Sequence, residues 1–412
     1  MKIGILAYHA ACNFGAFLQL LSTVEYIRNC GDEPLVINWM PSDFRDYYEK
    51  ASLPEVLHLY KELRQKYYPL TRLCETAQEV AETIKEDGIK AVIIGSDAVL
   101  QHHPFRERFY FPTRTVFTIG HPTSDRMYPN CFWGQFNDYL PESVPIAIIS
   151  GSCQDSKYFY IKGRTKKRMK SSILSFRHIS VRDEWTQKMI EYLTDGTIEP
   201  KVTPDPVFAF NHNAGHLLPN KETILKRFNI PDDYYLLSFK GPQSVSQSWI
   251  DEFQSIANKQ GIACVKLPYA DMKAYGNIQF SVGDLISPLE WYTLIKFSKG
   301  YVGNNMHPIV TCIHNNVPFY SFDNYGIAKI NGVSTNGESS KIYHILNCAG
   351  LLEYRVFIKK ADYIPPVPSE VIGKLTTFKK DKAFAFAQNY YTEYKQMMSR
   401  VCIVIKEKDG EK

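Results

Sequence analysis

Residues 2–39 have the sequence KIGILAYHAACNFGAFLQLLSTVEYIRNCGDEPLVINW. The unbroken apolar run over residues 2–7 is typical of a strand buried on both faces, the kind that parallel sheets contain. Residues 15–27 then repeat apolar side chains at helical spacing, and residues 34–39 are again strand-like. A strand, a helix and a second strand in this order predict a parallel β-α-β unit.

The same alternation continues through two series. The first has expected strands over residues 91–95, 146–150, 179–181 and at Val202, with helices over 77–87 and 184–193. The second follows a turn-rich segment and has expected strands over 234–239, 262–267, 301–302 and 319–322, with helices over 249–259, 289–297 and 307–315. The pattern predicts an α/β protein with two Rossmann-like domains facing a cleft, a GT-B-like architecture. Ligands of such sheets bind at the carboxyl ends of the strands.

Three segments follow from this pattern: an α/β domain over residues 1–209, a second over 210–366, and a helical segment over 367–412. The helical segment has no Gly or Pro after Gly373, so we expect one long helix, broken at most once, that packs back on the body. Residues 102–145 are rich in Pro, Gly, Asn and aromatic residues without a clear period, which indicates a long irregular insertion.

Composition narrows the class of protein. With 412 residues, 44% of them hydrophobic, the chain can bury the cores of more than one domain. A net charge of +5 is far from the basic surface of a dedicated nucleic-acid binder, so we expect no nucleic-acid partner. Nine scattered cysteines without a CxxC pair favour neither a zinc site nor a disulfide framework, and we expect no metal.

Hydropathy and the N-terminus predict a cytoplasmic protein. Polar Cys12 and Asn13 follow the first apolar residues too soon for the apolar region of a signal peptide. No stretch approaches the roughly 20 apolar residues that a membrane helix needs. Peripheral attachment at the inner face of a membrane stays open.

The strongest local motif covers residues 300–308, GYVGNNMHP, where a short strand ends and an apolar helix begins. Such a junction can present backbone N–H groups and the positive end of a helix dipole to an anion. Gly303, Asn304 and Asn305 would form it, with His307 in the first turn. The alternative is a helix-capping Asn followed by a surface histidine.

A second motif, ISVRDE at residues 179–184, delivers Arg182 at the carboxyl end of a strand. Arginine matches carboxylate and phosphate oxygens bidentately, so Arg182 is a candidate clamp for an anionic substrate. An ion pair with Asp183 or Glu184 is the alternative.

Three further polar strand ends are of the same kind. YHAACNFGA at residues 8–16 puts Asn13 and Gly15 before a helix, without the GxGxxG spacing of a dinucleotide site. Ser96 and Asp97 follow the AVII strand, and Ser152 follows the IAII strand. None of these motifs names a ligand by itself.

Taken together and in order, five segments resemble the polysaccharide pyruvyl transferase family, over residues 1 to about 322. They are KIGILAYHAACNFGAFLQ, AVIIGSDAVL, SVRDEWT, the Asp-Pro step at Asp205, and GNNMHPIVTCIHNNVPF. The chain departs from the family at Ala98 and Leu100, where Gln and Trp are expected, and in the 102–145 insertion. These departures leave the acceptor sugar open.

The resemblance implies an enzyme that moves a pyruvyl group from phosphoenolpyruvate to a sugar of a lipid-linked polysaccharide precursor, for example of a capsule or exopolysaccharide, and forms a ketal. It ties the motif histidine and arginine to donor binding and catalysis, here His307 and Arg182, with Asp97 as a candidate base. No cofactor beside the donor substrate is expected. It makes residues 1–209 the acceptor side and 210–366 the donor side. The expected substrate-binding residues are Asn13, Gly15, Ser96, Ser152, Gly303, Asn304 and Asn305.

Two other functions stay open. A nucleotide-sugar glycosyltransferase of the same architecture would also need a cationic pocket in the second domain. A catalytically silent binding protein could share the fold.

A basic run, KGRTKKRMK, covers residues 162–170 and contains Lys162, Arg164, Lys166, Lys167, Arg168 and Lys170. One interpretation is a solvated helix start. The other is peripheral contact with an anionic membrane, where a lipid-linked acceptor would be found.

Overall fold

The computed structural model describes residues 1–110, 118–270, 272–328, 335–360 and 362–407. Contacts between residues divide the chain into two compact units. Unit 1 consists of Met1–Cys12, Gln19–Asn213 and Thr392–Lys412, and unit 2 of Asn13–Leu18 and Ala214–Tyr391.

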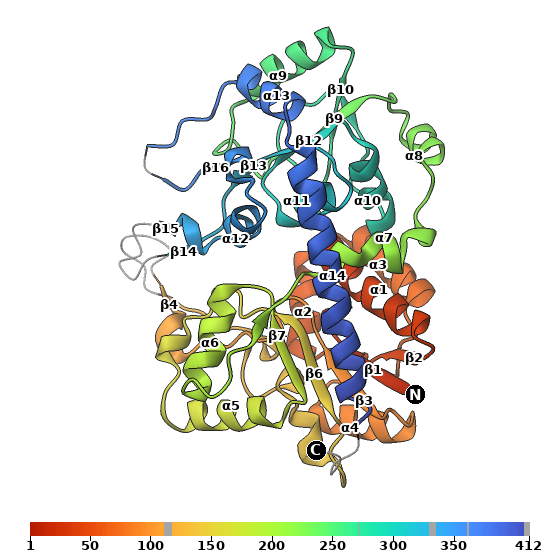
Figure 1. The fold of residues 1–412 in the computed structure, drawn as a ribbon, viewed down its shortest axis with the longest axis vertical. Helices are drawn as coiled ribbons and strands as arrows, with labels where there is room; N and C mark the ends of the chain where they lie inside the picture. The colour runs from red at the N-terminus through yellow and green to blue at the C-terminus, as the bar shows by residue number, and fades with distance from the viewer. Residues whose placement is uncertain (111–117, 271, 329–334, 361, 408–412) are drawn as a thin grey trace. The chain divides into compact units, whose positions relative to one another are not determined.

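Unit 1 is built on a six-stranded sheet in which every neighbouring pair of strands is parallel (Figure 1). In sheet order its strands are β2 (Glu33–Val36), β1 (Lys2–Leu6), β3 (Ala91–Ile94), β6 (Ile146–Gly151), β7 (His178–Val181) and β8 (Lys201–Val202). Its helices include most of α1 (Phe14–Asn29), α2 (Ser42–Ala51), α3 (Pro54–Tyr67), α4 (Ala77–Glu86), α5 (Gly163–Ser175) and α6 (Glu184–Thr194). All residues of β3 and β6 are buried, which explains apolar runs without alternation.

Unit 2 repeats the plan with a second parallel six-stranded sheet. In sheet order its strands are β11 (Phe280–Ser281), β10 (Ala263–Lys266), β9 (Tyr234–Ser238), β12 (Gly300–Gly303), β13 (Phe319–Asp323) and β16 (Arg355–Phe357). Its helices include α8 (Lys221–Phe228), α9 (Gln247–Lys259), α10 (Pro288–Phe297), α11 (Met306–His314), α12 (Lys341–Cys348) and α13 (Pro368–Thr376). The predicted class, α/β with two parallel sheets, is confirmed.

The division of the chain differs from the predicted one in two places. The predicted boundary lies near residue 210, whereas the units separate after Asn213. Asn13–Leu18, expected in the first domain, belong to unit 2. The C-terminal segment forms two helices, α13 and α14 (Lys380–Val404), and α14 contributes to unit 2 up to Tyr391 and to unit 1 from Thr392.

Residues 111–117 of the predicted 102–145 insertion lie outside the described residues. The rest of the insertion is irregular, as predicted, yet part of it enters the core. It contains 3₁₀ turns at Phe105–Arg108, Ser124–Arg126, Cys131–Trp133 and Gln135–Tyr139, and a short antiparallel pair, β4 (Phe109–Tyr110) and β5 (Thr118–Ile119). Phe132, Trp133 and Phe136 are at most 2% exposed. These aromatic side chains pack into the core of unit 1.

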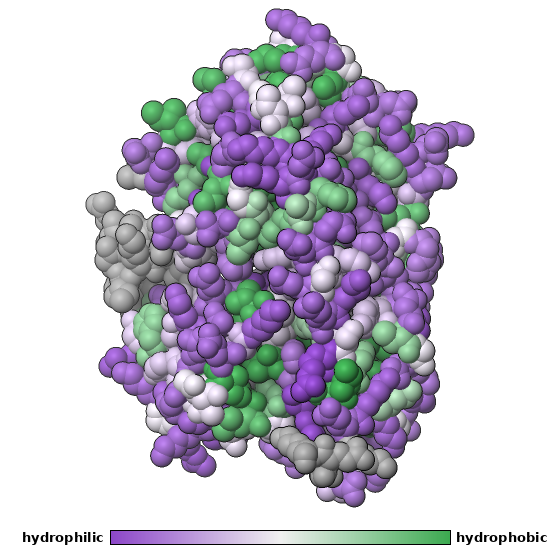
Figure 2. Space-filling view, viewed as in Figure 1, coloured by the Kyte–Doolittle hydropathy of each residue, from purple (hydrophilic) through white to green (hydrophobic). Residues whose placement is uncertain are grey.

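Two properties of the structure concern membrane contact: the apolar character of the helices and the hydropathy of the surface. Within the described ranges, no helix combines the length and apolar character needed to cross a membrane. Figure 2 shows hydrophilic residues over most of the face in view, with smaller hydrophobic patches between them.

Candidate active site

In unit 1, Arg182 lies at the carboxyl end of β7 between two carboxylates. Its Nη2 is 3.2 Å from Asp97 Oδ1 and its Nη1 is 3.2 Å from Asp205 Oδ2. Arg182 and Asp205 are buried, whereas a quarter of the Asp97 side chain is exposed. Burial opposes the charge of Arg182, but Asp97 and Asp205 outweigh it and raise the pKa of Arg182. The guanidinium therefore stays charged, and its two terminal nitrogens are held by the protein.

The loop after β3 holds Ser96 and Asp97 in an unusual backbone conformation. Gly95 has φ +118°, and a Cβ there would lie 2.4 Å from the carbonyl oxygen of Ile149. Asp97 has φ +79° although it is not glycine. The hydroxyl of Ser96 is buried and has no hydrogen-bond partner within the described part of the chain. Strained backbone and orphaned polar groups gather at functional sites, so this loop is a candidate part of one.

Ser152 has a structural role in this arrangement. Its hydroxyl donates to Asp183 Oδ2 (2.8 Å) and accepts from the backbone N–H of Gln154 (3.0 Å). Asp183 in turn caps α6 by accepting from the N–H of Thr186 (2.7 Å). The carboxylates that pair with Arg182 are thus Asp97 and Asp205, rather than the adjacent Asp183 or Glu184 considered from the sequence.

In unit 2, His307 lies in the first turn of α11 and packs against the start of α1. A Cβ on Gly15 would lie 2.2 Å from the His307 ring, so only glycine fits there without a shift. Asn13 accepts a hydrogen bond from the N–H of Ala16 (3.1 Å), as a cap of α1 does. Phe14 stacks on Trp291, with ring centroids 5.1 Å apart. Two motifs nearly 300 residues apart in sequence therefore meet at one place.

Gly303, Asn304 and Asn305 join the strand ends of unit 2, and this corrects the predicted phosphate cradle. The N–H of Asn304 donates to Ser238 O (3.1 Å) and that of Asn305 to Tyr301 Oη (3.3 Å), so neither is available to an anion in this arrangement. The buried Asn304 side chain accepts from the N–H of Lys240 (2.8 Å) and donates to Ser244 Oγ (3.0 Å).

Two lysines that sequence reasoning missed gather near these residues. Lys240 Nζ lies 5.0 Å and Lys341 Nζ 4.5 Å from the centroid of the Tyr325 ring. The Tyr325 hydroxyl donates to Asn305 Oδ1 (3.0 Å). Lys240, Asn305 and Tyr325 each stand two residues after a strand, β9, β12 and β13, and these strands are neighbours in the sheet. This shared offset from adjacent strand ends is the signal by which the sequence could have revealed the cluster.

Sequence comparison decides the family. Residues 13–325 match the family model described as polysaccharide pyruvyl transferase. The chain belongs to the polysaccharide pyruvyl transferase family. It is therefore a transferase of polysaccharide biosynthesis, and its acceptor is a sugar or polysaccharide. Among curated proteins, none matches the sequence closely.

Solved structures show the fold of this pyruvyl transferase. The UDP-GlcNAc 2-epimerase from Methanocaldococcus jannaschii matches with a TM-score of 0.51 at 9% identity, covering 97% of this chain and 100% of that chain. A putative UDP-N-acetylglucosamine 2-epimerase from Listeria monocytogenes matches with a TM-score of 0.51 at 10% identity, covering 99% of this chain and 97% of that chain. At such low identity these likenesses support the α/β fold alone.

The predicted site residues of the pyruvyl transferase fall into two groups. One, in unit 1, consists of Ser96, Asp97, Ser152 and Arg182. The other, in unit 2, consists of Asn13, Gly15, Gly303, Asn304, Asn305 and His307. Within the described residues there is no group of three or more His, Cys, Asp or Glu side chains that could hold a metal ion.

Proposed function

We propose that this enzyme transfers the pyruvyl group of phosphoenolpyruvate to two hydroxyls of one sugar and releases phosphate. The methylene carbon takes up a proton, which leaves a cationic centre at C2. One sugar oxygen bonds to C2, the C2–O bond to phosphate breaks, and a second sugar oxygen bonds to C2. Of the two hydroxyl protons, one balances the proton on the new methyl group and the other leaves with phosphate. The atoms and charges of this reaction balance without a cofactor.

The observation that carries this proposal is the cation cluster of unit 2, Lys240 and Lys341 around Tyr325. Both side chains are half-buried, and both lie at the carboxyl edge where α/β sheets bind ligands. Phosphoenolpyruvate carries a carboxylate and a phosphate on a three-carbon unit. Two ammonium groups at one edge of the sheet suit both anions, aided by the positive end of α11.

His307 is the residue that we propose as proton donor to the methylene carbon. It is half-buried in the first turn of α11, and its ring is held against Gly15. A positioned proton donor contributes about 10²–10⁴-fold to a rate.

Arg182 and Asp97 are proposed on weaker grounds. One guanidinium faces two carboxylates, which offset the positive charge that an anionic substrate would meet at Arg182. That Arg182 clamps the donor stays a prediction. Asp97, partly exposed and oriented by Arg182, stays the candidate base for a sugar hydroxyl.

The direct test is turnover with a panel of saccharides, including lipid-linked ones, and phosphoenolpyruvate. We expect phosphate release that depends on the saccharide, and a product whose NMR spectrum gains one methyl singlet on a ketal carbon. If nucleotide sugars are consumed instead and phosphoenolpyruvate is not, the enzyme is a glycosyltransferase and the proposal fails.

A further inference from the structure

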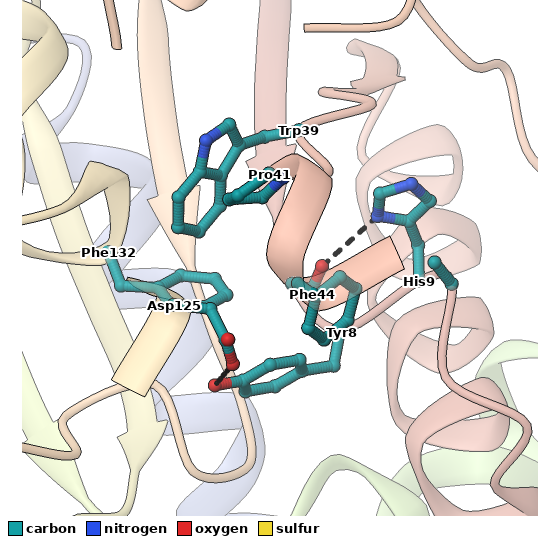
Figure 3. Close-up of a pocket in the computed structure, with 9 residues that line it drawn as sticks. Tyr8, His9, Trp39, Pro41, Phe44, Asp125 and Phe132 are labelled. Atoms are coloured by element: carbon teal, nitrogen blue, oxygen red, sulfur yellow. Dashed lines mark hydrogen bonds between the residues drawn. The ribbon is translucent and has the colours of Figure 1, made fainter. Parts of the chain in front are cut away.

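Unit 1 contains a small pocket that none of the predicted site residues lines (Figure 3). Tyr8 comes from the loop after β1, Trp39 from the loop after β2, and Phe44 from α2. Asp125 and Phe132 come from the 102–145 insertion. The pocket has about 200 Å³ of empty space, counting its opening to solvent, and room inside for about one water molecule. We call it the Tyr8–Asp125 pocket.

Asp125 is the carboxylate at the wall of this pocket, which His9 also lines, and it is 2% exposed. Its Oδ2 accepts a hydrogen bond from the Tyr8 hydroxyl (2.9 Å), as Figure 3 shows. Its Oδ2 also lies 3.8 Å from Arg126 Nε. Its Oδ1 is buried and has no hydrogen-bond partner in the described part of the chain. Burial raises the pKa of Asp125, against the lowering effects of Thr123 and Arg126. A buried acceptor without a partner is costly and calls for a bound water or ligand.

The insertion holds Asp125 rigidly. Ser124 donates to both oxygens of Asp43 through its N–H and its hydroxyl, at 2.7 Å each. The Asn130 side chain donates to the carbonyl oxygen of Asp125 (2.6 Å). The rings of Tyr8 and Phe132 pack with centroids 4.9 Å apart. The carboxylate is therefore fixed in place before any ligand arrives, as binding sites require.

We propose that the Tyr8–Asp125 pocket receives a hydroxyl of the acceptor saccharide, which donates a hydrogen bond to Asp125 Oδ1. The size admits one hydroxyl and leaves the rest of the sugar at the opening. A carboxylate repels an anion such as phosphoenolpyruvate. A neutral sugar hydroxyl, in contrast, can donate the hydrogen bond that Asp125 Oδ1 lacks. This inference rests on the proposed function in taking the acceptor to be a sugar.

The pocket also gives the insertion a role. Phe132 and Asp125 would let it choose among acceptors, because a site built to bond a hydroxyl rejects an analogue that lacks it, by up to about 10⁴–10⁵-fold. Specificity would then come from the part of the chain that departs from the family.

The test is the double variant Tyr8→Phe with Asp125→Leu. Removing the Tyr8 hydroxyl and the Asp125 carboxylate together leaves neither of these two groups unsatisfied. Because the change also removes the carboxylate that lies 3.8 Å from Arg126 Nε, circular dichroism and urea unfolding first establish that the double variant is folded. We expect kcat/KM for the saccharide to fall about 10- to 100-fold, as for loss of a hydrogen bond to a charged group, with unchanged affinity for phosphoenolpyruvate. Asp125→Asn, which keeps the shape, is the second variant and should show a fall in the same direction. Tyr192→Phe, which removes a hydroxyl bonded to Ile161 O (2.8 Å), is the matched control and should change neither value.

Each outcome decides something. A folded double variant with parental kcat/KM means that the pocket holds a structural water only, and the inference is overturned. If the parent releases no phosphate with any saccharide, the proposed function fails instead. Ligand-detected NMR with methyl hexosides then tests the pocket alone: binding by the parent that the double variant loses supports it, and equal or absent binding in both overturns it.

Discussion

At the scale of the residue, Arg182 of unit 1 is buried and pairs with two carboxylates. Because Arg182 pairs with both Asp97 and the buried Asp205, Arg182→Ala should lower the free energy of unfolding by about 3–5 kcal/mol, as for other broken buried pairs. Urea unfolding measures this. Lys299→Ala, which breaks an exposed pair with Asp233, is the control and should cost about 0–1 kcal/mol. A loss below about 1 kcal/mol for Arg182→Ala would show that the pairs are not formed in solution.

A second prediction concerns His307 and Gly15, because the His307 ring lies where a side chain at residue 15 would be. His307→Ala should lower kcat by about 10²–10⁴-fold. Gly15→Ala should also lower kcat, since its Cβ would lie 2.2 Å from the ring and displace it. In the double variant the two losses should not add, as for residues in contact. Fully additive losses would mean that Gly15 does not act through His307.

Residue chemistry was only partly predictable from the sequence. The strand-end motifs located His307 and Arg182, because turn and helix signals are local. The partners of Arg182 were not predictable, since Asp97 and Asp205 are brought to it by sheet order. Lys240 was missed because its position two residues after β9 becomes informative only when β9, β12 and β13 are known to be neighbours, and Lys341 has no such offset from a strand. The phosphate cradle at Asn304 and Asn305 was mistaken because hydrogen bonds to Ser238 and Tyr301 use both N–H groups.

At the scale of the element, α5 contains most of the basic run. Some of its basic side chains form ion pairs, and others are exposed. Lys166 and Lys170 bond to the carboxylate of Asp195 at 2.7 and 2.8 Å and hold the pKa of Asp195 down to about 2. Lys162, Arg164, Lys167 and Arg168 are exposed, and the guanidinium of Arg168 lies 5.8 Å from the centroid of the Tyr128 ring.

We propose that three of these exposed residues, Lys162, Arg164 and Lys167, contact anionic membranes, each contributing on the order of 1 kcal/mol. The parent should co-sediment with phosphatidylserine vesicles at low salt and be released at high salt. Changing all three to Gln should abolish this, whereas Lys166→Gln with Lys170→Gln should weaken it less. Vesicle binding that survives the triple change would make the run a solvated helix face.

The insertion makes a pH-dependent prediction through His102. The N–H of Tyr128 donates to His102 Nδ1 (3.1 Å), which must therefore be unprotonated. Burial, with His103 and Arg108, lowers the pKa of His102 from 6.5 to about 4. Between pH 6.5 and about pH 4, His102 takes up a proton in the unfolded chain but not in the folded one. The free energy of unfolding therefore falls as the pH drops below 6.5, by at most about 1.4 kcal/mol per pH unit.

Urea unfolding at pH 7 and pH 5 checks this, with His102→Asn as the comparison because Asn keeps an acceptor and does not titrate. His9, whose pKa burial also lowers to about 4, contributes in both proteins. The variant should lose less stability than the parent across this range. An equal loss would show that His102 is protonated in the folded state.

Among the elements, the buried strands were the easiest to predict, since β1, β3 and β6 are unbroken apolar runs. The helices α2 and α3 were missed, although their apolar residues follow one face, because α2 is mostly polar and starts after a proline. The short edge strands β11 and β16 have two and three residues, too few to show a period.

At the scale of the whole molecule, two parallel sheets agree with the predicted α/β architecture, and the chain belongs to the pyruvyl transferase family. The domain limits were harder to predict, because some segments belong to a unit from which they are distant in sequence. Asn13–Leu18 belong to unit 2, and the last helix belongs to unit 1 from Thr392 onward. The unit to which such a segment belongs depends on tertiary packing, which leaves no signal in the local sequence.

The central claim is that the cluster around Tyr325 binds phosphoenolpyruvate, and calorimetry tests it most directly. The parent should bind phosphoenolpyruvate and not UDP-sugars, and Lys240→Ala with Lys341→Ala should weaken binding at least about 10-fold, as loss of charged hydrogen bonds does. Lys273→Ala, an exposed lysine of the same unit, should bind as the parent does. A parent that binds UDP-sugars but not phosphoenolpyruvate, or a double variant with parental affinity, would contradict the account.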